Sequence, residues 1–308
     1  MHATSLVRSI GAAAMIACAA ACASAPLQRR ATAITAADRD AKDAVAGETR
    51  IDPSRIPARA FGVLPFAVAT RDTLLRPLGH ALAEFLSTDL SRSNALQIVD
   101  RLRTDAIMRE LSLVDQGVID PRGAPRVGRL VGARRLLIGE VKSGAPGSID
   151  ITASVVDVIA GTVQKVVSAS APLDRVIDAE KTLALRLFEE LGITLTPAQR
   201  IAVEQRQTTN LAATVAYGKG LDAEAHGDAI GAARAFQEAS QRDAAFGAAR
   251  AQLSANAPSQ STERRGPSRV LELSAQAINA PAGAKLPEVA DAALTARILT
   301  LVINVRVF

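Results

Sequence analysis

Short apolar runs alternate with stretches of helical periodicity along the first two-thirds of the chain. Runs at residues 60–66, 96–100 and 135–141 predict three buried strands, and the first of them should end or bulge at its proline. Residues 148–157 and 162–170 alternate apolar with polar side chains, which is the period of a half-buried strand. The pattern therefore predicts about five strands, the last two joined by a tight turn.

Helices are predicted where apolar side chains recur at intervals of three and four residues. This spacing covers residues 77–92, 125–131 and 176–191, and a further helix is expected to start near Thr104 as its N-terminal cap. The resulting order, β-α-β-α-α-β-β-β-α, predicts an α/β (α+β) fold in which helices pack on a mixed sheet. A domain of roughly 140 residues buries about two-thirds of its unfolded surface, so we expect it to fold alone.

The last third of the chain has a different pattern, with predicted helices and no predicted strand before its final apolar run. Thr196 followed by Pro197 predicts the start of a helix, and two more helices are predicted over residues 211–226 and 229–242. The composition then turns to Ser, Pro, Arg and Thr, which is typical of a disordered linker. Residues 298–308 form a final apolar run and predict an edge strand that pairs with a partner.

The first 25 residues have the layout of a secretory signal, with a short basic start and an uncharged Ala-rich run too short to span a membrane. Both cysteines, Cys18 and Cys22, follow small or apolar residues in this run, which resembles the bacterial lipobox. We expect lipidation at Cys22, with Cys18 as the alternative. A cut after Ala25 is the rival, but it would leave Pro26 at the new terminus. No later stretch predicts a transmembrane helix.

Ala follows either cysteine. By resemblance to known lipoprotein sorting, this implies the periplasmic face of the outer membrane. Outer-membrane lipid, bound through the acyl anchor, is therefore the first partner that we expect.

Composition argues against several kinds of chemistry. The formal charge is +5 and is spread along the chain, aromatic residues make up 3%, and there is no Trp. Single-strand nucleic-acid binding needs stacking aromatics in a basic groove, so we expect no nucleic-acid partner. His2, His80 and His226 are scattered, and no metal-ligand, nucleophile or phosphate-loop motif is complete. We expect no catalytic residue, no metal and no cofactor.

Residues 98–141 carry a motif series that resembles the CsgG-like family, whose namesake is the curli secretion channel. In that family a strand ends in Val-Asp/Glu-Arg, a helix and a Gly-containing segment follow, and a second helix ends in Gly-Ala before a strand that ends near Gly. The matching positions, for which the resemblance implies structural roles, are Asp100, Arg101, Gly117, Gly128, Gly132, Gly139 and, further on, Gly161. The resemblance covers about residues 58–191.

The channel proteins of this family insert two long membrane-crossing hairpins that this sequence lacks. Residues 142–147 supply only a turn, and residues 171–174 lead straight into a helix. A membrane strand needs about 9–11 residues, so neither place can supply a hairpin. We therefore expect a non-catalytic binding or assembly module whose partners are envelope proteins, with a homo-oligomer also considered. A subunit of a curli-like secretion complex is the alternative, and an enzyme of unknown type comes third.

The helical pair over residues 211–242 resembles one tetratricopeptide repeat. Its matching residues are Gly220, Gly227, Ala232, Phe236 and Ala239, whereas Ala223 replaces the large aromatic of the first helix. One repeat cannot bury its own face, so it should pack on a neighbouring helix, on the first domain or on a partner. Plain helical-hairpin packing is the alternative.

These observations divide the chain into five segments. A polar, Ala-rich tether with one short helix near residues 36–45 is expected to hold the body off the membrane. The segments are a lipoprotein signal (1–22), the tether (23–56), a CsgG-like α/β domain (57–195), a helical repeat-like segment (196–255) and a linker with a C-terminal strand (256–308).

Overall fold

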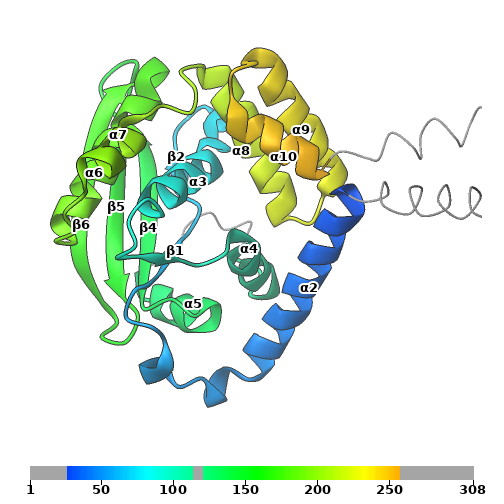
Figure 1. Cartoon of the computed structure of the whole chain (residues 1–308), viewed down its shortest axis with the longest axis vertical. Helices are drawn as coiled ribbons and strands as arrows, with labels where there is room; N and C mark the ends of the chain where they lie inside the picture. The colour runs from blue at the N-terminus through cyan, green and yellow to red at the C-terminus, as the bar shows by residue number, and fades with distance from the viewer. Residues whose placement is uncertain (1–25, 114–120, 257–308) are drawn as a thin grey trace, which may run out of the picture. The chain divides into compact units, whose positions relative to one another are not determined.

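The computed structural model describes residues 26–113 and 121–256, and residues Arg29–Ala257 form one compact unit. The predicted signal (1–22), Gly117 and the predicted C-terminal strand (298–308) lie outside the described residues. Figure 1 shows the unit as a sheet with helices on both sides and a group of three helices beside it. The expected α/β fold with a mixed sheet is confirmed, and the sheet has six strands.

The sheet is parallel on one side and antiparallel on the other. Its order is β3-β1-β4-β5-β6, with β2 pairing on β4 beyond the end of β1. β1 pairs in parallel with β3 and β4, whereas β4, β5 and β6 form an antiparallel meander. The strands are β1 Ala60–Val63, β2 Ala67–Ala69, β3 Gln97–Ile98, β4 Arg135–Ser143, β5 Ser148–Asp157 and β6 Thr162–Pro172.

The sixth strand, β2, follows directly after the single strand that was expected over residues 60–66. Pro65 has no backbone N–H to donate to the sheet, so the run breaks after Val63 and resumes as β2. Both pieces pair with β4, and Leu64 N still donates to Leu137 O at 3.0 Å.

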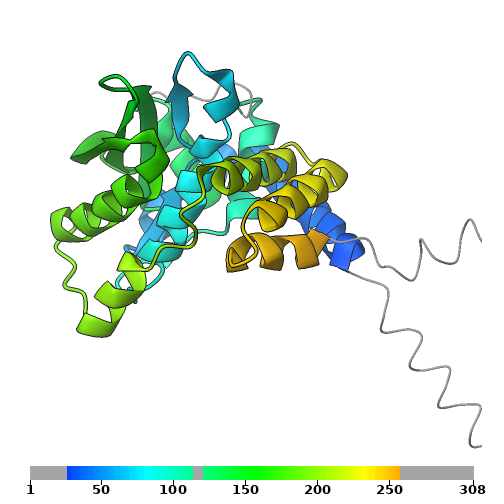
Figure 2. The same ribbon diagram turned by 90° about the horizontal axis from the view of Figure 1, so that it is seen from above.

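Some of the helices cover the two faces of the sheet. The helices of the described residues are α2 Pro26–Ala46, α3 Leu78–Leu90, α4 Arg101–Glu110, α5 Ala124–Val131, α6 Val176–Glu190, α7 Pro197–Glu204, α8 Leu211–Ala225, α9 Ala229–Arg242 and α10 Gly247–Asn256. Because side chains alternate along a strand, β4 sends Leu137 and Val141 into the cluster that includes α3 and α6. It sends Leu136 and Ile138 into the cluster that includes α4 and α5. Figure 2 shows α6 along one face of the meander.

Helix α4 starts about one turn earlier than predicted. It begins at Arg101, and Asp100 is its N-cap, accepting from Leu102 N at 2.7 Å and Arg103 N at 3.3 Å. The expectation that Thr104 caps this helix is wrong, because Thr104 lies one turn inside it and is buried. An Asp side chain is a strong N-cap, so the carboxylate determines the start.

The three helices at the end of the described chain share the core of the sheet domain. Phe85 of α3 stacks on Tyr217 of α8, with ring centroids 5.7 Å apart and planes 9° apart. Phe246, just before α10, lies 6.0 Å from Phe85 and 4.9 Å from Tyr217. The expected boundary near residue 195 therefore does not separate two cores, and α10 is a helix that the periodicity did not predict.

The segment expected to be a tether contains a long helix. α2 covers 21 residues, Pro26–Ala46, instead of a short stretch near residues 36–45. Within the compact unit, Ile34 and Ala41 are buried, and Ala41 belongs to the cluster around α4 and α5. From Arg29 onward this part of the chain is packed on the body.

No helix within the described ranges is long and apolar enough to cross a membrane.

Candidate functional site

A network of buried charges lies where α2, α4, α8 and α10 meet, and Glu224 of α8 is at its centre. Glu224 is fully buried and accepts from Arg30 Nε and Nη2 at 2.7 and 2.6 Å and from Asn256 Nδ2 at 2.7 Å. Arg101 Nη2 donates to the same carboxylate. Burial alone would raise the pKa of Glu224, but the hydrogen bond from Arg30 and the nearby cations lower it. Glu224 is therefore held as a carboxylate.

Arg101, a family-motif residue, links this carboxylate to two others. Its guanidinium lies 2.7 Å from Asp105 Oδ2 and 3.2 Å from Glu84 Oε2. Burial disfavours the charge of Arg101, yet the three carboxylates together raise its pKa. Burial also raises the pKa of both Glu84 and Asp105. Such a network fixes the relative position of helices, because removing one partner leaves a buried charge unpaired.

Arg109 of α4 extends the network to the end of α8 and to α2. It donates to Ala225 O at 2.5 Å and to Glu224 O at 3.3 Å, and it pairs with Asp38 of α2. A cation at a helix C-terminus satisfies the last carbonyls and opposes the negative end of the helix dipole. No local pattern predicts these roles of Arg30, Asp38 and Glu224, because their partners are far away in the chain.

The family-motif glycines allow close packing and turns. A Cβ at Gly128 would lie 2.2 Å from Val158 Cγ2, and one at Gly139 would lie 2.4 Å from the Phe66 ring. Gly132 and Gly161 have φ of +81° and +67°, which L side chains rarely adopt.

The repeat-like residues meet at the α8–α9 crossing. A Cβ at Gly220 would lie 2.4 Å from the Phe236 ring, so glycine lets the two helices approach. Ala232 and Ala239 are buried on α9, and Gly227 makes the turn with φ of +80°. The buried aromatic that the sequence reasoning missed is Tyr217, three residues before Gly220.

A second buried charge group ties α3 to α6. Lys181 Nζ donates to Asp89 Oδ2 at 2.6 Å and lies 3.2 Å from Glu180 Oε2. Burial raises the pKa of Glu180 well above its usual value, and the neighbouring Asp89 raises it further. The pKa of Asp89 is also raised by burial. This group packs inside the core and is not open to a substrate.

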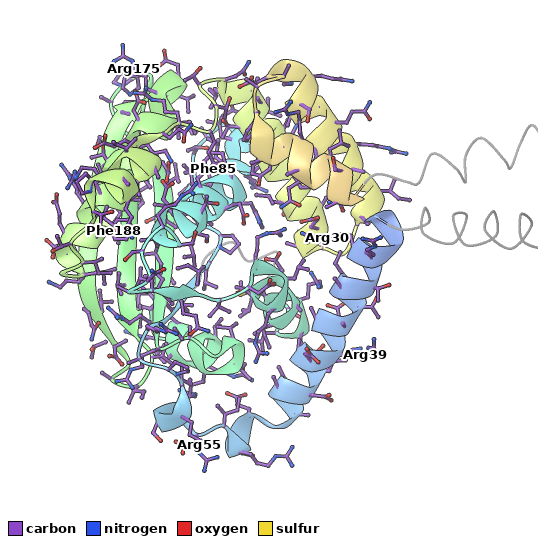
Figure 3. The ribbon with its side chains drawn as sticks, viewed as in Figure 1. Arg30, Arg39, Arg55, Phe85, Arg175 and Phe188 are labelled. Atoms are coloured by element: carbon purple, nitrogen blue, oxygen red, sulfur yellow. The ribbon has the colours of Figure 1, made fainter. Side chains whose placement is uncertain are left out.

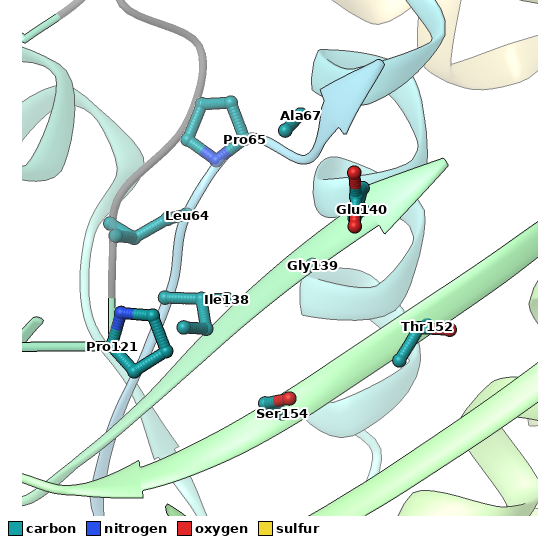
Figure 4. Close-up of a pocket in the computed structure, with 9 residues that line it drawn as sticks. All are labelled: Leu64, Pro65, Ala67, Pro121, Ile138, Gly139, Glu140, Thr152 and Ser154. Carbon is teal, nitrogen blue, oxygen red and sulfur yellow. The ribbon is translucent and has the colours of Figure 1, made fainter. Parts of the chain in front are cut away.

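The face of β4 and β5 away from α6 carries a hollow of about 210 Å³. Figure 4 shows Pro65 at its rim and Glu140, Thr152 and Ser154 on the strands below. Glu140 forms an ion pair with Lys142 at 2.6 Å, and the hydroxyl groups of Thr152 and Ser154 belong to the same lining. Among the residues that the structure describes, no group of three or more His, Cys, Asp or Glu is placed to hold a metal ion.

The outer edge of β6 is the longest strand edge that no described strand pairs with. Val163 and Val166 are 43% and 58% exposed on this strand, and Ile159 at the preceding turn is 45% exposed. Arg186 of α6 donates to Ser168 O of β6. We call Ile159, Val163 and Val166 the β6 patch. An unpaired edge beside exposed apolar side chains is suited to binding another protein.

The fold and these sites define an α/β module with a helical segment packed into the same core, held together by buried ion pairs. Residues 58–143 match the family described as curli production assembly/transport component CsgG. The resemblance to CsgG is thus confirmed over these residues, a shorter stretch than the expected 58–191. At the family level, the match supports an envelope-associated module without enzymatic activity.

A search of curated protein sequences finds no match. Among solved structures, the C-terminal domain of LpoB from Salmonella enterica is 16% identical, covering 41% of this chain and 91% of its own, with a TM-score of 0.32. Lipoprotein GNA1162 from Neisseria meningitidis is 14% identical, covering 45% and 99%, with a TM-score of 0.32. A PelC dodecamer from Paraburkholderia phytofirmans is 16% identical, covering 44% and 88%, with a TM-score of 0.24.

Proposed function

We propose that this protein is a lipoprotein of the outer membrane whose periplasmic body is a non-catalytic binding or assembly module for other envelope proteins. The observation that carries the proposal is the CsgG match over residues 58–143, combined with a tight β4–β5 connection. The buried charged groups around Glu224 and around Lys181 pair with one another between helices, which suits a scaffold.

The anchor in this proposal is the acyl group on Cys22, with Cys18 as the alternative. Residues Pro26–Ala46 of the expected tether (23–56) are helical, and from Arg29 onward they belong to the compact unit. We propose that α2 links the anchor to the body.

The β6 patch and the helical segment are the surfaces that we assign to partners. The β6 edge can add a strand, and the repeat-like pair α8–α9 leaves Ile230 exposed by 61%. We keep the tetratricopeptide-like interpretation of Gly220, Gly227, Ala232, Phe236 and Ala239 as part of this proposal.

A subunit of a curli-like secretion complex is the second candidate, and the family match is its support. Four residues, Gly144–Gly147, join β4 to β5, and a three-residue turn, Leu173–Arg175, joins β6 to α6. A membrane-crossing hairpin would need two strands of about 9–11 residues each, so neither connection favours this candidate.

The anchor is tested by membrane fractionation of cells that express the native chain, Cys22→Ala, Cys18→Ala and the double variant. We expect Cys22→Ala and the double variant to lose labelling with a fatty-acid analogue and to leave the membrane fraction. Cys18→Ala should behave like the native chain. If the double variant still sediments with membranes, acyl anchoring is wrong.

The binding role is tested by in vivo crosslinking of Val166→Lys, with Ile201→Lys as the matched control. Val166 and Ile201 are exposed by 58% and 69%, but Val166 lies on β6 whereas Ile201 lies on α7. We expect Val166→Lys to lose crosslinked envelope partners and Ile201→Lys to keep them. Equal crosslinking by both variants would contradict the β6 patch.

A further inference from the structure

α2 is held to the body by a thin apolar contact. From Arg29 onward only Ile34 and Ala41 are buried on this helix, and the partly buried apolar residues beside them include Ala37 and Ala44. Alanine buries little area, so this stripe contributes far less than the Leu and Phe residues of a core helix such as α3.

Ion pairs from three charged residues fasten the arm, which we define as residues 29–50. Arg30 pairs with Glu224 at 2.6 Å, and Asp38 pairs with Arg109. Glu48 lies 2.9 Å from Arg126 and 3.9 Å from Arg129. Along the arm a cation, Arg30, is followed by two anions, Asp38 and Glu48. The body faces each of them with a residue of opposite charge. Figure 3 shows Arg30 at one end of α2, whereas Arg39 further along is exposed.

The body does not need the arm to satisfy its own charges. Glu224 would keep Arg101 and Asn256 as partners if Arg30 left. Arg109 would keep the carbonyl oxygens at the end of α8. Arg126 is already 52% exposed, so water can solvate it.

Release of the arm would therefore leave each of these charged groups hydrogen-bonded within the body or solvated, unlike the loss of a residue from the body of the network. Ala41 of the arm belongs to the same apolar cluster as Ile107 and Met108 of α4 and Val127 of α5. We use the word groove for the surface that the arm covers, which these apolar residues and the paired charges form.

We propose that this groove is a binding site for an amphipathic helix of a partner protein, and that the arm closes it in cis. The partner helix would have an apolar stripe of small residues, a cation to meet Glu224 and, about two turns later, an anion to meet Arg109. The argument is charge complementarity, because the arm already demonstrates the pattern that the groove accepts. This deepens the proposed function: the partner is an envelope protein, and the arm regulates its access.

The hinge of the arm lies in the short connection that precedes β1. Residues Glu48–Arg50 and Pro53–Arg55 form single 3₁₀ turns, and neither contains a buried residue. Ile51, which follows the first turn, packs on the cluster around α4 and α5, so the arm of residues 29–50 would open on the N-terminal side of this contact while the sheet stays folded.

The test measures binding of a fluorescent peptide with the sequence of residues 26–50 to the detergent-solubilised full chain. In Asp38→Arg the arm should be repelled by Arg109, so this variant should bind the native peptide at least tenfold more tightly than the unsubstituted chain. The Arg109→Asp chain should instead bind a peptide that carries Asp38→Arg more tightly than it binds the native peptide. The double variant restores the pair in cis and should bind neither peptide tightly.

Hydrogen exchange accompanies the binding assay. Amides of residues 29–46 should exchange faster in Asp38→Arg, while those of β4 and β5 stay protected. If Arg109→Asp does not fold, the more exposed pair of Glu48 and Arg126 can be used instead. Glu48→Arg should then bind the native peptide, and Arg126→Glu should bind a peptide that carries Glu48→Arg.

Two results would overturn the proposal. The first is that the opened variants bind neither peptide although their sheets are protected. The second is that a mixture of Asp38→Arg and Arg109→Asp chains forms dimers, which would make the arm of a second copy the occupant instead of a separate partner. Because no acyl group is needed, failure here is distinguishable from failure of the lipid anchor.

Discussion

The joint between the sheet domain and the helical segment depends on Gly218 of α8. A Cβ at this position would lie 2.0 Å from Pro77 O and 2.7 Å from Pro77 C, both backbone atoms at the start of α3. Ordinary van der Waals contact begins near 3.4 Å. In Gly218→Ala the two helices must therefore move apart by about 1.4 Å, the difference between 3.4 and 2.0 Å, because backbone cannot rotate away as a flexible side chain can.

The magnitude follows from two opposing effects. Alanine is favoured over glycine inside a helix by about 1 kcal/mol. Overpacking costs about 1–3 kcal/mol, and a gap of about 1 Å forfeits up to half of the dispersion energy of the atoms that separate, which here include Tyr217 and Phe85. We expect a net loss of about 2 kcal/mol in the free energy of unfolding, or about 4–8 °C in Tm.

Gly247→Ala is the matched control for this prediction. Gly247 opens α10, and a Cβ there meets nothing within 4 Å. The same chemical change should leave stability unchanged or raise it by at most about 1 kcal/mol. The two variants are thus expected to differ in sign.

The assay uses the single tyrosine of a chain without tryptophan. Tyr217 is buried in the α3–α8 contact, so its emission and near-ultraviolet circular dichroism report on this joint, while far-ultraviolet circular dichroism follows overall unfolding. If Gly218→Ala melts at or above the temperature of the native chain with unchanged Tyr217 emission, the close-approach argument is refuted.

Three more predictions follow from buried groups. Burial raises the pKa of Glu180 above its usual 4.5, so the folded state binds an extra proton, and the free energy of unfolding should fall as pH rises from about 4.5 through the folded pKa. Denaturant titrations of Glu180→Gln should show a flatter pH dependence, which keeps only the part that Asp89 contributes; an unchanged slope would contradict the buried proton. Asp100→Ala should cost about 1 kcal/mol by removing the N-cap of α4, whereas Asp100→Asn should cost much less; equal losses would contradict the cap assignment. Residues 57–195 expressed alone should bind a hydrophobic dye and melt below the full chain, because Phe85 loses Tyr217 and Phe246; a melt as high as that of the full chain would contradict the shared core.

Periodicity predicted most of the sheet domain because its elements are built from large apolar residues. The α3 helix and the β5–β6 hairpin fall within two residues of their expected bounds, since a Leu face and an alternating strand pattern have one physical solution each. The split at Pro65 was anticipated as an end or a bulge, but not the second strand beyond it. The start of α4 was misplaced by a turn because Thr104 and Asp100 are both cap-forming residues.

The docking of α2 could not be predicted, because nothing local signals it. Its apolar stripe is mostly alanine, and its strongest partner, Glu224, is 194 residues from Arg30. A charge on an Ala-rich helix looks solvated until the fold brings a buried carboxylate to it. The candidate groove was hidden for the same reason, since each of its ion pairs joins residues that lie far apart in the chain.

The position of Arg101 explains why the helical segment belongs to this module. Arg101 lies within the CsgG match, yet Glu224 lies 123 residues later and outside that match. Without Arg101, the buried carboxylate of Glu224 would keep only Arg30 and Asn256 as partners. Because removing one partner of a buried ion pair is costly, the helical segment that carries Glu224 should be more stable on the family-like domain than apart from it. Glu224 also accepts the hydrogen bonds of Arg30. The same buried carboxylate therefore joins the helical segment to Arg101 and holds the arm.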